Sequence, residues 1–176
     1  MKKDDLWLDS CAYTHAAQDP PRADSQKELA QDIVALRAIK ELFRAREIEL
    51  GISLNVISEI NGNDDYEKAQ RFWADVEPVT YPQEIGLAGC RIPSGDGNYE
   101  SLVAGWEQKL APIAKKVGDY PGKDTALLIN CAYFGGIFIT TDYKFLNKLR
   151  SEGRDINFLR ASRPSDYILK HMKKNE

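Results

Sequence analysis

Apolar residues in this chain occur in short continuous runs and in stripes with helical spacing. Continuous runs at 6–8 and 137–139 predict strands that are buried on both faces. Alternating apolar and polar residues predict another strand at 52–58, while shorter apolar segments predict one at 156–159 and a weaker one at 79–81. The first two runs lead directly into polar segments that contain an aspartate.

Apolar residues three or four positions apart predict the helices. They are expected at 25–47, 64–76, 99–117, 124–134, 143–150 and from 164 onward. Ser25 and Glu28 have the spacing of a capping box at the start of the first helix, and Gly135 and Gly136 mark the end of the fourth. Because strands and helices alternate, we expect an α/β fold with a parallel sheet that is covered on both faces.

The length and composition fit one globular domain. The chain has 176 residues, of which 43% are apolar and 29% are charged. No internal repeat, low-complexity segment or linker divides the sequence, so we expect a single domain over residues 1–176. Residues 82–122 contain a long loop rich in glycine and proline followed by a helix, and the role of this segment stays open.

The charges and cysteines narrow the class of protein. The net charge is −3, so the chain as a whole is not a polyanion binder, although basic residues outnumber acidic ones from Lys144 to the C-terminus. This basic segment fits a phosphate-facing patch, but a solvated helix face is the commoner explanation. The three cysteines lack the spacing of a disulfide framework or a zinc site, and neither a signal peptide nor a membrane span is visible. We therefore expect a cytoplasmic protein.

Four acidic residues occupy positions from which their side chains can converge. Asp9 and Asp142 follow the two buried strands, and Glu59 follows the alternating strand. The carboxyl ends of parallel strands meet at one edge of the sheet, where ligands bind in such folds. Asp124 opens the apolar stripe of the helix at 124–134, so we expect it to point inward next to the sheet.

Each of these acids also has an ordinary structural explanation. An aspartate after a strand often caps the next helix, and the dipole of a helix favours an acid such as Asp124 in its first turn. Four converging carboxylates repel each other, however, unless a cation neutralises them. Oxygen ligands suit Mg²⁺ or Mn²⁺, and such ions activate water and bind phosphate oxygens. Together the acids predict a divalent-metal site that cleaves a phosphodiester of a nucleic acid.

The same residues resemble the motifs of the PIN-domain ribonucleases. That family has an apolar strand that ends in Asp, matched at 6–10, and a Glu after the second strand, matched at Glu59. It also has an Asp that opens a helix, followed by an apolar strand that runs into Ser/Thr-x-Asp, and residues 123–146 match this pattern closely. The usual Pro-x-x-aromatic ending is matched at 163–169.

The resemblance covers roughly residues 5–170 and has two departures. The segment 82–122 is longer than in compact members of the family, which affects the rim of the pocket. The familiar Asp-Thr-Asn opening is replaced by Asp9, Ser10 and Cys11. Ser10 supplies the usual hydroxyl, whereas Cys11 lacks the amide.

The resemblance implies a three-layer α/β/α sandwich with a parallel central sheet, and a metal-dependent endoribonuclease that hydrolyses single-stranded RNA by metal-activated water. Asp9, Asp124 and Asp142 would hold Mg²⁺ or Mn²⁺ directly. Glu59 would bind the metal or orient the water, and Thr140 would position a carboxylate.

The resemblance also suggests what the protein binds. Lys144 and Arg91 are expected near the RNA phosphates, although a plain surface charge is the commoner role of such residues. Many small domains of this kind are toxins that a partner protein inhibits. An inhibitory partner and a homo-oligomer are therefore considered besides RNA, and contact with a membrane is not expected.

Other function classes fit the sequence less well. A phosphatase with an aspartyl nucleophile needs an aspartate where Cys11 stands, and no phosphate-binding glycine motif is present. His15 and His171 are too isolated for a catalytic triad or a zinc site. Two alternatives stay open: a non-catalytic PIN-like binding or scaffold module, and a structure-specific DNA nuclease. The scaffold gives no reason for clustered acids, and no basic arm favours the DNA nuclease.

Overall fold

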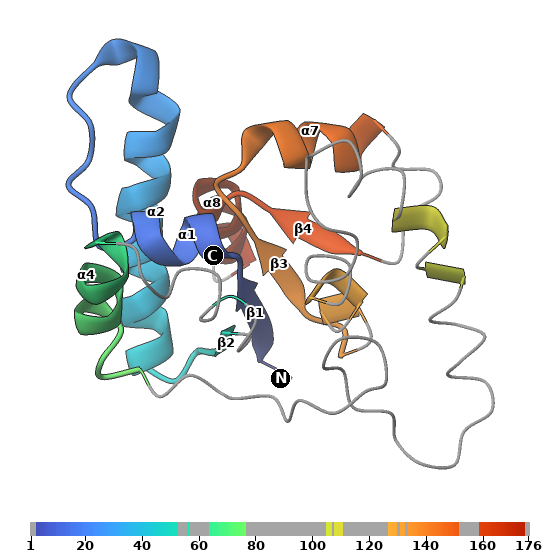
Figure 1. Cartoon of the computed structure of the whole chain (residues 1–176). Coiled ribbons are helices and arrows are strands. Elements are labelled where there is room, and N and C mark those ends of the chain that lie inside the picture. The colour runs from blue at the N-terminus through green and yellow to red at the C-terminus, as the bar shows by residue number, and fades with distance from the viewer. Residues whose placement is uncertain are drawn as a thin grey trace.

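The structure is a computed structural model of the whole chain (Figure 1). The residues that it describes are 3–52, 56, 64–76, 105–106, 108–110, 127–129, 131–132, 134–151 and 159–174. Within these ranges, no helix combines the length and the apolar character that crossing a membrane requires.

Four strands form one sheet in the order β2-β1-β3-β4. Their bounds are β1 Asp4–Leu8, β2 Ile48–Ile52, β3 Ile137–Ile139 and β4 Arg160–Ser162. Each of the three pairings is parallel, and Leu6 of β1 lies opposite Leu50 on one side and Ile137 on the other. The expected parallel sheet is confirmed.

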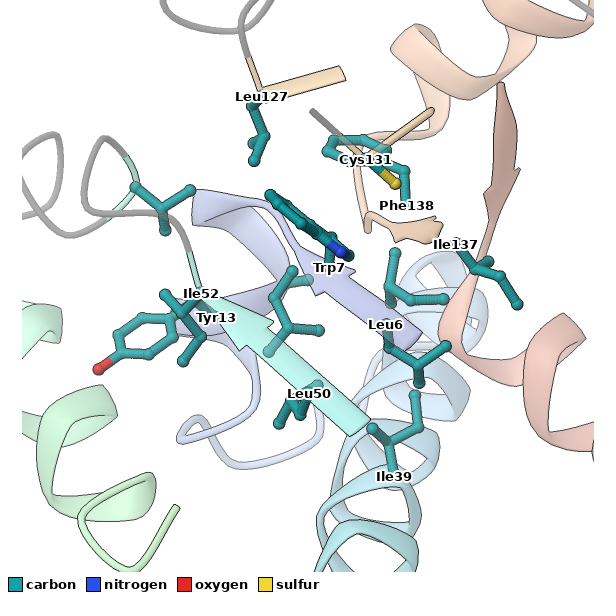
Figure 2. Packing of buried hydrophobic residues seen from close by; sticks show 14 of the residues in the cluster. Leu6, Trp7, Tyr13, Ile39, Leu50, Ile52, Leu127, Cys131, Ile137 and Phe138 are labelled. Carbon is teal, nitrogen blue, oxygen red and sulfur yellow. The ribbon is translucent and has the colours of Figure 1, made fainter. Parts of the chain in front are cut away.

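The sheet is covered on both faces. Successive side chains of a strand point to opposite faces, yet Leu6, Trp7 and Leu8 are exposed by only 0%, 1% and 0%. Trp7 points toward Leu127 and Cys131, whereas Ile39 lies on the other side of the sheet (Figure 2). Burial on both faces makes the fold a three-layer α/β/α sandwich, as expected.

The helices connect the strands and supply the outer layers. They are α1 Ser10–His15, α2 Lys27–Arg44, α4 Asp64–Phe72, α7 Tyr143–Ser151 and α8 Pro164–Lys174. The long helix α2 packs against α8, and α1 packs against α4 (Figure 1). Trp73, just after α4, donates from its indole N–H to the carbonyl of Tyr13 in α1 at 3.1 Å. The starts of α7 and α8 agree with the sequence expectation.

The strand expected at 52–58 was wrong in position. β2 ends at Ile52, where it pairs with the last residue of β1, and Val56 is helical and buried. The strand ends there because β1 turns into α1 at Asp9, so the paired length is limited by β1.

The ends of the first long helix also differ from the expectation. Ser25 lies in a short 3₁₀ helix, Asp24–Gln26, and Gln26 caps α2 without a side-chain hydrogen bond. The carboxylate of Glu28 forms an ion pair with Arg163 at 3.3 Å, so the capping box was wrong. At the other end α2 stops at Arg44, and Arg46 takes a positive φ of 60°.

Two expectations in the C-terminal half need correction. The strand at 156–159 was placed too early, because β4 begins at Arg160 in register with Ile137 of β3. The apolar stripe of the helix expected at 124–134 predicts a buried Phe134, but this side chain is 45% exposed and stacks on Trp7 at a ring-centroid distance of 6.0 Å. The strand at 79–81 and the loop at 82–97 lie outside the described residues.

The helix before β3 ends as the sequence predicts. Gly135 has a φ of 69°, a left-handed conformation that favours glycine at the end of a helix. The N–H groups of Gly135 and Gly136 donate to the carbonyls of Ala132 and Cys131 at 3.0 and 2.8 Å. Gly136 also lies close to Trp7, where an added Cβ would come within 2.8 Å of the indole ring.

Candidate functional site

Asp9 and Asp142 reach the same edge of the sheet because β1 and β3 are parallel neighbours. Leu8 of β1 is paired with Ile139 of β3. The backbone N–H of Asp9 then donates to the carbonyl of Ile139 at 3.1 Å, which extends the pairing by one step. Both strands leave the sheet through a short segment that carries an aspartate, so the two acids lie at the carboxyl edge.

Asp9 caps helix α1. Its backbone is extended, with φ −79° and ψ 174°, and its Oδ1 accepts from the N–H of Ala12 at 2.5 Å. Its carbonyl accepts from the N–H of Tyr13 at 2.9 Å, which starts the helix. Its other carboxylate oxygen accepts a hydrogen bond from the hydroxyl of Thr140. The side chain is half-buried and held at both oxygens.

Thr140 joins the two aspartates through one hydroxyl group. It is fully buried directly after β3, and its backbone N–H donates to the carbonyl of Ser162 in β4 at 3.2 Å. The hydroxyl donates to Asp9 and accepts from the backbone N–H of Asp142 at 2.9 Å. Thr140 therefore connects the Asp9 carboxylate to the backbone of Asp142 through hydrogen bonds.

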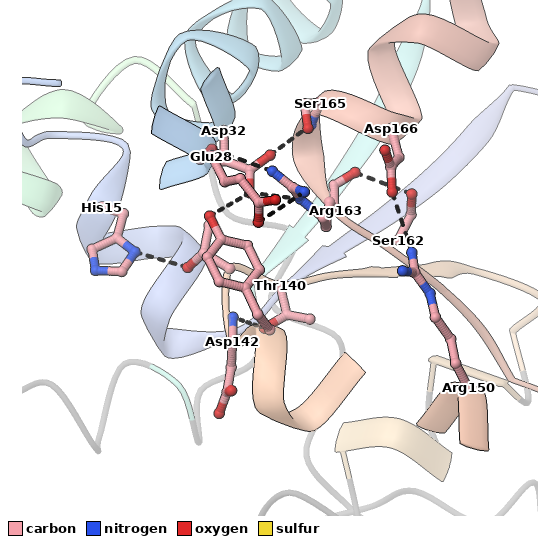
Figure 3. A network of polar contacts seen from close by, with 12 residues as sticks. His15, Glu28, Asp32, Thr140, Asp142, Arg150, Ser162, Arg163, Ser165 and Asp166 are labelled. Carbon is pink, nitrogen blue, oxygen red and sulfur yellow. Dashed lines mark hydrogen bonds and ion pairs between the residues drawn. The ribbon is translucent and has the colours of Figure 1, made fainter. Parts of the chain in front are cut away.

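Asp142 caps helix α7. Its Oδ1 accepts from the N–H of Phe145 at 3.0 Å, and its carbonyl accepts from the N–H of Leu146 at 3.0 Å. The carboxylate is half-buried and extends away from Thr140 in Figure 3. The cap explanation that accompanied the metal-site hypothesis is therefore realised at Asp142 as well as at Asp9.

The other predicted site residues are only partly described. Glu59, Asp124 and Arg91 lie outside the described residues. Ser10 is the half-buried first residue of α1, and its carbonyl accepts from the hydroxyl of Thr14 at 2.9 Å. Lys144 is exposed in the first turn of α7. Among the residues that the structure describes, no group of three or more metal-binding side chains comes together.

A buried carboxylate beside the site was missed by the sequence reasoning. Asp32 of α2 is 0% exposed and accepts three hydrogen bonds (Figure 3). The donors are the Tyr143 hydroxyl at 2.9 Å, the Arg163 Nε at 3.2 Å and the Ser165 N–H at 3.1 Å. The available signal was its place on the apolar stripe of a helix, where an acid is rare unless it is paired.

The negative charge of Asp32 and the positive charge of Arg163 compensate each other. Burial lowers the pKa of Arg163, but the hydrogen bond and the charge of Asp32 outweigh burial and hold that pKa above its usual value. Burial and the adjacent Asp32 raise the pKa of the Tyr143 phenol, so its hydroxyl remains a donor. The guanidinium carbon of Arg163 also lies 4.8 Å from the centre of the Tyr143 ring.

His15 contacts the segment between β3 and α7. It is the last residue of α1, and its Nδ1 shares a hydrogen bond of 2.8 Å with the hydroxyl of Thr141. Burial lowers the pKa of His15, while Asp65 and Asp32 act in the opposite direction. The imidazole is therefore neutral over a wider pH range than in a solvated histidine.

The donor atoms at this edge fit a hard divalent cation. Asp9 and Asp142 offer carboxylate oxygens, which are the ligands that Mg²⁺ and Mn²⁺ prefer. Among the described residues, the Asp142 carboxylate accepts from the backbone N–H of Phe145, which occupies only some of its lone pairs. Both aspartates are half-buried at the carboxyl edge of the sheet, outside the apolar core.

Comparisons with known proteins give a fold likeness. No family model matches this sequence, and no curated protein matches it. The chain is similar to the crystal structure of VapBC2 from Rickettsia felis bound to a DNA fragment from their promoter, with 13% identity and a TM-score of 0.47. The match covers 90% of this chain and 98% of that chain. The strand order and pairing of the chain itself carry the fold assignment.

Proposed function

We propose that this protein is a metal-dependent endoribonuclease that hydrolyses phosphodiester bonds of single-stranded RNA. The observation that carries the proposal is the pair of half-buried aspartates at the carboxyl edge of a parallel sheet, joined through the buried hydroxyl of Thr140. Asp9 and Asp142 are ligands of Mg²⁺ or Mn²⁺ in this proposal. Asp124 and Glu59 complete the ligand set, as the resemblance to PIN-domain ribonucleases implies.

Each site residue has a role in the proposed reaction. The bound cation supplies a positive charge that neutralises phosphate oxygens and lowers the pKa of water. Asp9 and Asp142 would hold it at the sheet edge, each as the cap that precedes a helix. Thr140 keeps Asp9 oriented through its hydroxyl. Ser10 supports the start of α1, and Lys144 and Arg91 meet the RNA phosphates.

The proposal also includes the domain organisation of the chain and its binding partners. We place the activity in a single domain over residues 1–176, supported by one apolar core cluster that includes residues from Leu6 to Tyr167. An inhibitory protein partner belongs to the proposal, by the resemblance to toxin nucleases. Action on DNA and a non-catalytic binding role are the alternatives that an activity assay must separate.

The test is cleavage of end-labelled single-stranded RNA by the purified chain with Mg²⁺, Mn²⁺ or EDTA. We expect cutting with either metal, none with EDTA, and a loss of at least about 100-fold in Asp9→Asn and Asp142→Asn. Asparagine caps a helix about as well as aspartate, so both variants should keep the fold. A labelled single-stranded DNA and a DNA flap run beside the RNA test the nucleic acid class.

Two results would contradict the proposal. Cleavage by Asp142→Asn at the rate of the unchanged protein would mean that Asp142 is only a helix cap. Absence of cutting with every metal, together with absence of metal binding in calorimetry, would favour the scaffold role. Metal binding without cutting would leave the metal site in place and move the search to other nucleic acid substrates.

A further inference from the structure

The turn that carries Asp142 is held from three sides. This Asp142 turn consists of residues 140–143 and connects β3 to α7. Thr140 donates to Asp9 before α1, and Thr141 is hydrogen-bonded to His15 at the end of α1. Tyr143 donates to Asp32 in the second turn of α2 at 2.9 Å. Every residue of the turn except Asp142 therefore has its side chain tied to another element.

The hydrogen bond to α2 ends on a fully buried carboxylate. Both oxygens of Asp32 are occupied: Oδ2 accepts from Tyr143 and Arg163, and Oδ1 accepts from the N–H of Ser165. Arg163 reaches further to Glu28, with an ion pair at 3.3 Å and a second 3.3 Å hydrogen bond to the Glu28 carbonyl. One carboxylate thereby connects α2, the first residue of α7 and the junction between β4 and α8.

Burial makes this arrangement rigid. Asp32 has no exposed surface, so a partner that leaves it cannot be replaced by bulk water without a desolvation cost. The Tyr143 ring is also covered on one side by Arg163. The hydroxyl of Tyr143 is therefore fixed by Asp32, and its ring is fixed by Arg163. The backbone of Tyr143 directly follows that of Asp142.

We propose that Asp32 and Tyr143 are positioning residues for Asp142, an inference that rests on the proposed metal-dependent function. The hydrogen bond between them fixes the start of α7, and this start sets where the Asp142 carboxylate lies relative to Asp9. Partners that orient ligand side chains commonly change metal affinity when they are removed. Thr141 and His15 hold the same turn from the side of α1.

The test compares two tyrosines that each donate a hydrogen bond to an aspartate. Tyr143→Phe removes the hydroxyl that donates to Asp32, and leaves Asp32 with Arg163 and Ser165 as donors. Tyr167→Phe is the matched control, because the buried Tyr167 donates to the carboxylate of Asp4 at 3.2 Å, at the start of β1 rather than at the site edge. Mn²⁺ affinity by calorimetry is measured for the whole chain and both variants, with kcat and KM for RNA.

The expected result is a difference between the two variants. Tyr143→Phe should weaken Mn²⁺ binding roughly ten-fold and lower kcat, while KM for RNA changes by less than about two-fold. Tyr167→Phe should stay within about two-fold of the unchanged protein in all three quantities. Thr141→Val, which removes the tie to His15, should shift Mn²⁺ affinity in the same direction as Tyr143→Phe and serves if that variant folds poorly.

The outcomes separate this inference from the proposed function. If the unchanged protein binds Mn²⁺ and cuts RNA, but Tyr143→Phe and Thr141→Val behave as it does, the positioning role is overturned and the proposed function stands. Equal losses in Tyr143→Phe and Tyr167→Phe would also overturn it, since they would indicate general loosening. If the unchanged protein neither binds Mn²⁺ nor cuts RNA, the proposed function fails and this inference fails with it.

Discussion

One region of this molecule contains a fully buried aspartate and two half-buried aspartates at the carboxyl edge of the sheet. Asp32 is fully buried and carries its counter-charge inside the protein, in the form of Arg163. Asp9 and Asp142 are half-buried at the sheet edge, and their described partners are backbone N–H groups and a hydroxyl. The fold supplies the counter-charge of Asp32, whereas the described partners of Asp142 leave acceptor positions on its carboxylate open.

In the proposed function, this difference in hydrogen-bond donors distinguishes the structural acid Asp32 from the metal ligand Asp142. A carboxylate that is paired with an arginine in the core has its charge neutralised there, and removal of one partner leaves an uncompensated buried charge. A carboxylate oriented by neutral donors keeps its charge for an external cation. In the sequence, all three acids lie near apolar residues, so the sequence alone does not distinguish them. The hydrogen-bond donors that the structure shows do.

Removal of Asp32 should have the largest effect on stability. Asp32→Ala removes the buried partner of Arg163, whose ion pair with the exposed Glu28 remains, and deprives Tyr143 and Ser165 of an acceptor. We expect a loss of about 3–5 kcal/mol in the free energy of unfolding, measured by urea denaturation.

The control for this variant is an exposed acid. Glu67 pairs with Arg71 at 3.1 Å one helical turn away, and both side chains are more than 70% exposed. Glu67→Ala should therefore cost about 0.5 kcal/mol or less. If Asp32→Ala lowered the free energy of unfolding as little as Glu67→Ala, Asp32 would not be a structural acid, and its distinction from Asp9 and Asp142 would be lost.

Asp9 should show a smaller effect on stability that depends on the replacement. Asp9→Ala removes the cap of α1 and the acceptor of Thr140, which should cost about 1–2 kcal/mol. Asp9→Asn keeps the cap and should cost clearly less. Urea denaturation of both variants checks the difference, and equal losses would mean that the charge of Asp9, rather than its cap, stabilises the fold.

His15 should give the smallest effect, seen as a pH dependence. Burial lowers its pKa in the folded chain below 6.5, so the unfolded chain binds more protons between the lowered pKa and pH 6.5. The free energy of unfolding should therefore fall as the pH drops through this window. His15→Gln should flatten that fall in denaturation curves recorded from pH 7 to pH 5, and an unchanged slope would refute it.

The sequence predicted the elements in which local pattern and tertiary burial agree. The apolar runs 6–8 of β1 and 137–139 of β3 are short and buried on both faces, which suits the central strands of a parallel sheet. The glycines before β3 and the proline at the start of α8 fixed those boundaries through backbone geometry. The same apolar runs predicted the positions of Asp9 and Asp142 at the ends of these two strands.

The remaining features depend on partners that lie far away in the sequence. β2 ends at Ile52 because its neighbour β1 ends, and no pattern within 52–58 contains that information. Glu28 fits a capping box by spacing, but Arg163 offers it a better partner. Asp32 is likewise explained by Arg163, which lies more than a hundred residues later in the chain.

The most direct test of the central claim is Mn²⁺ binding by the unchanged protein and by Asp142→Asn, measured by titration calorimetry. Asparagine preserves the cap on Phe145 and removes only the charge. If Asp142 is a metal ligand, the unchanged protein binds Mn²⁺ and the variant binds it at least about ten-fold more weakly, with the same unfolding curve. Equal Mn²⁺ affinity in the two proteins would contradict the account, because Asp142 would then be a helix cap alone.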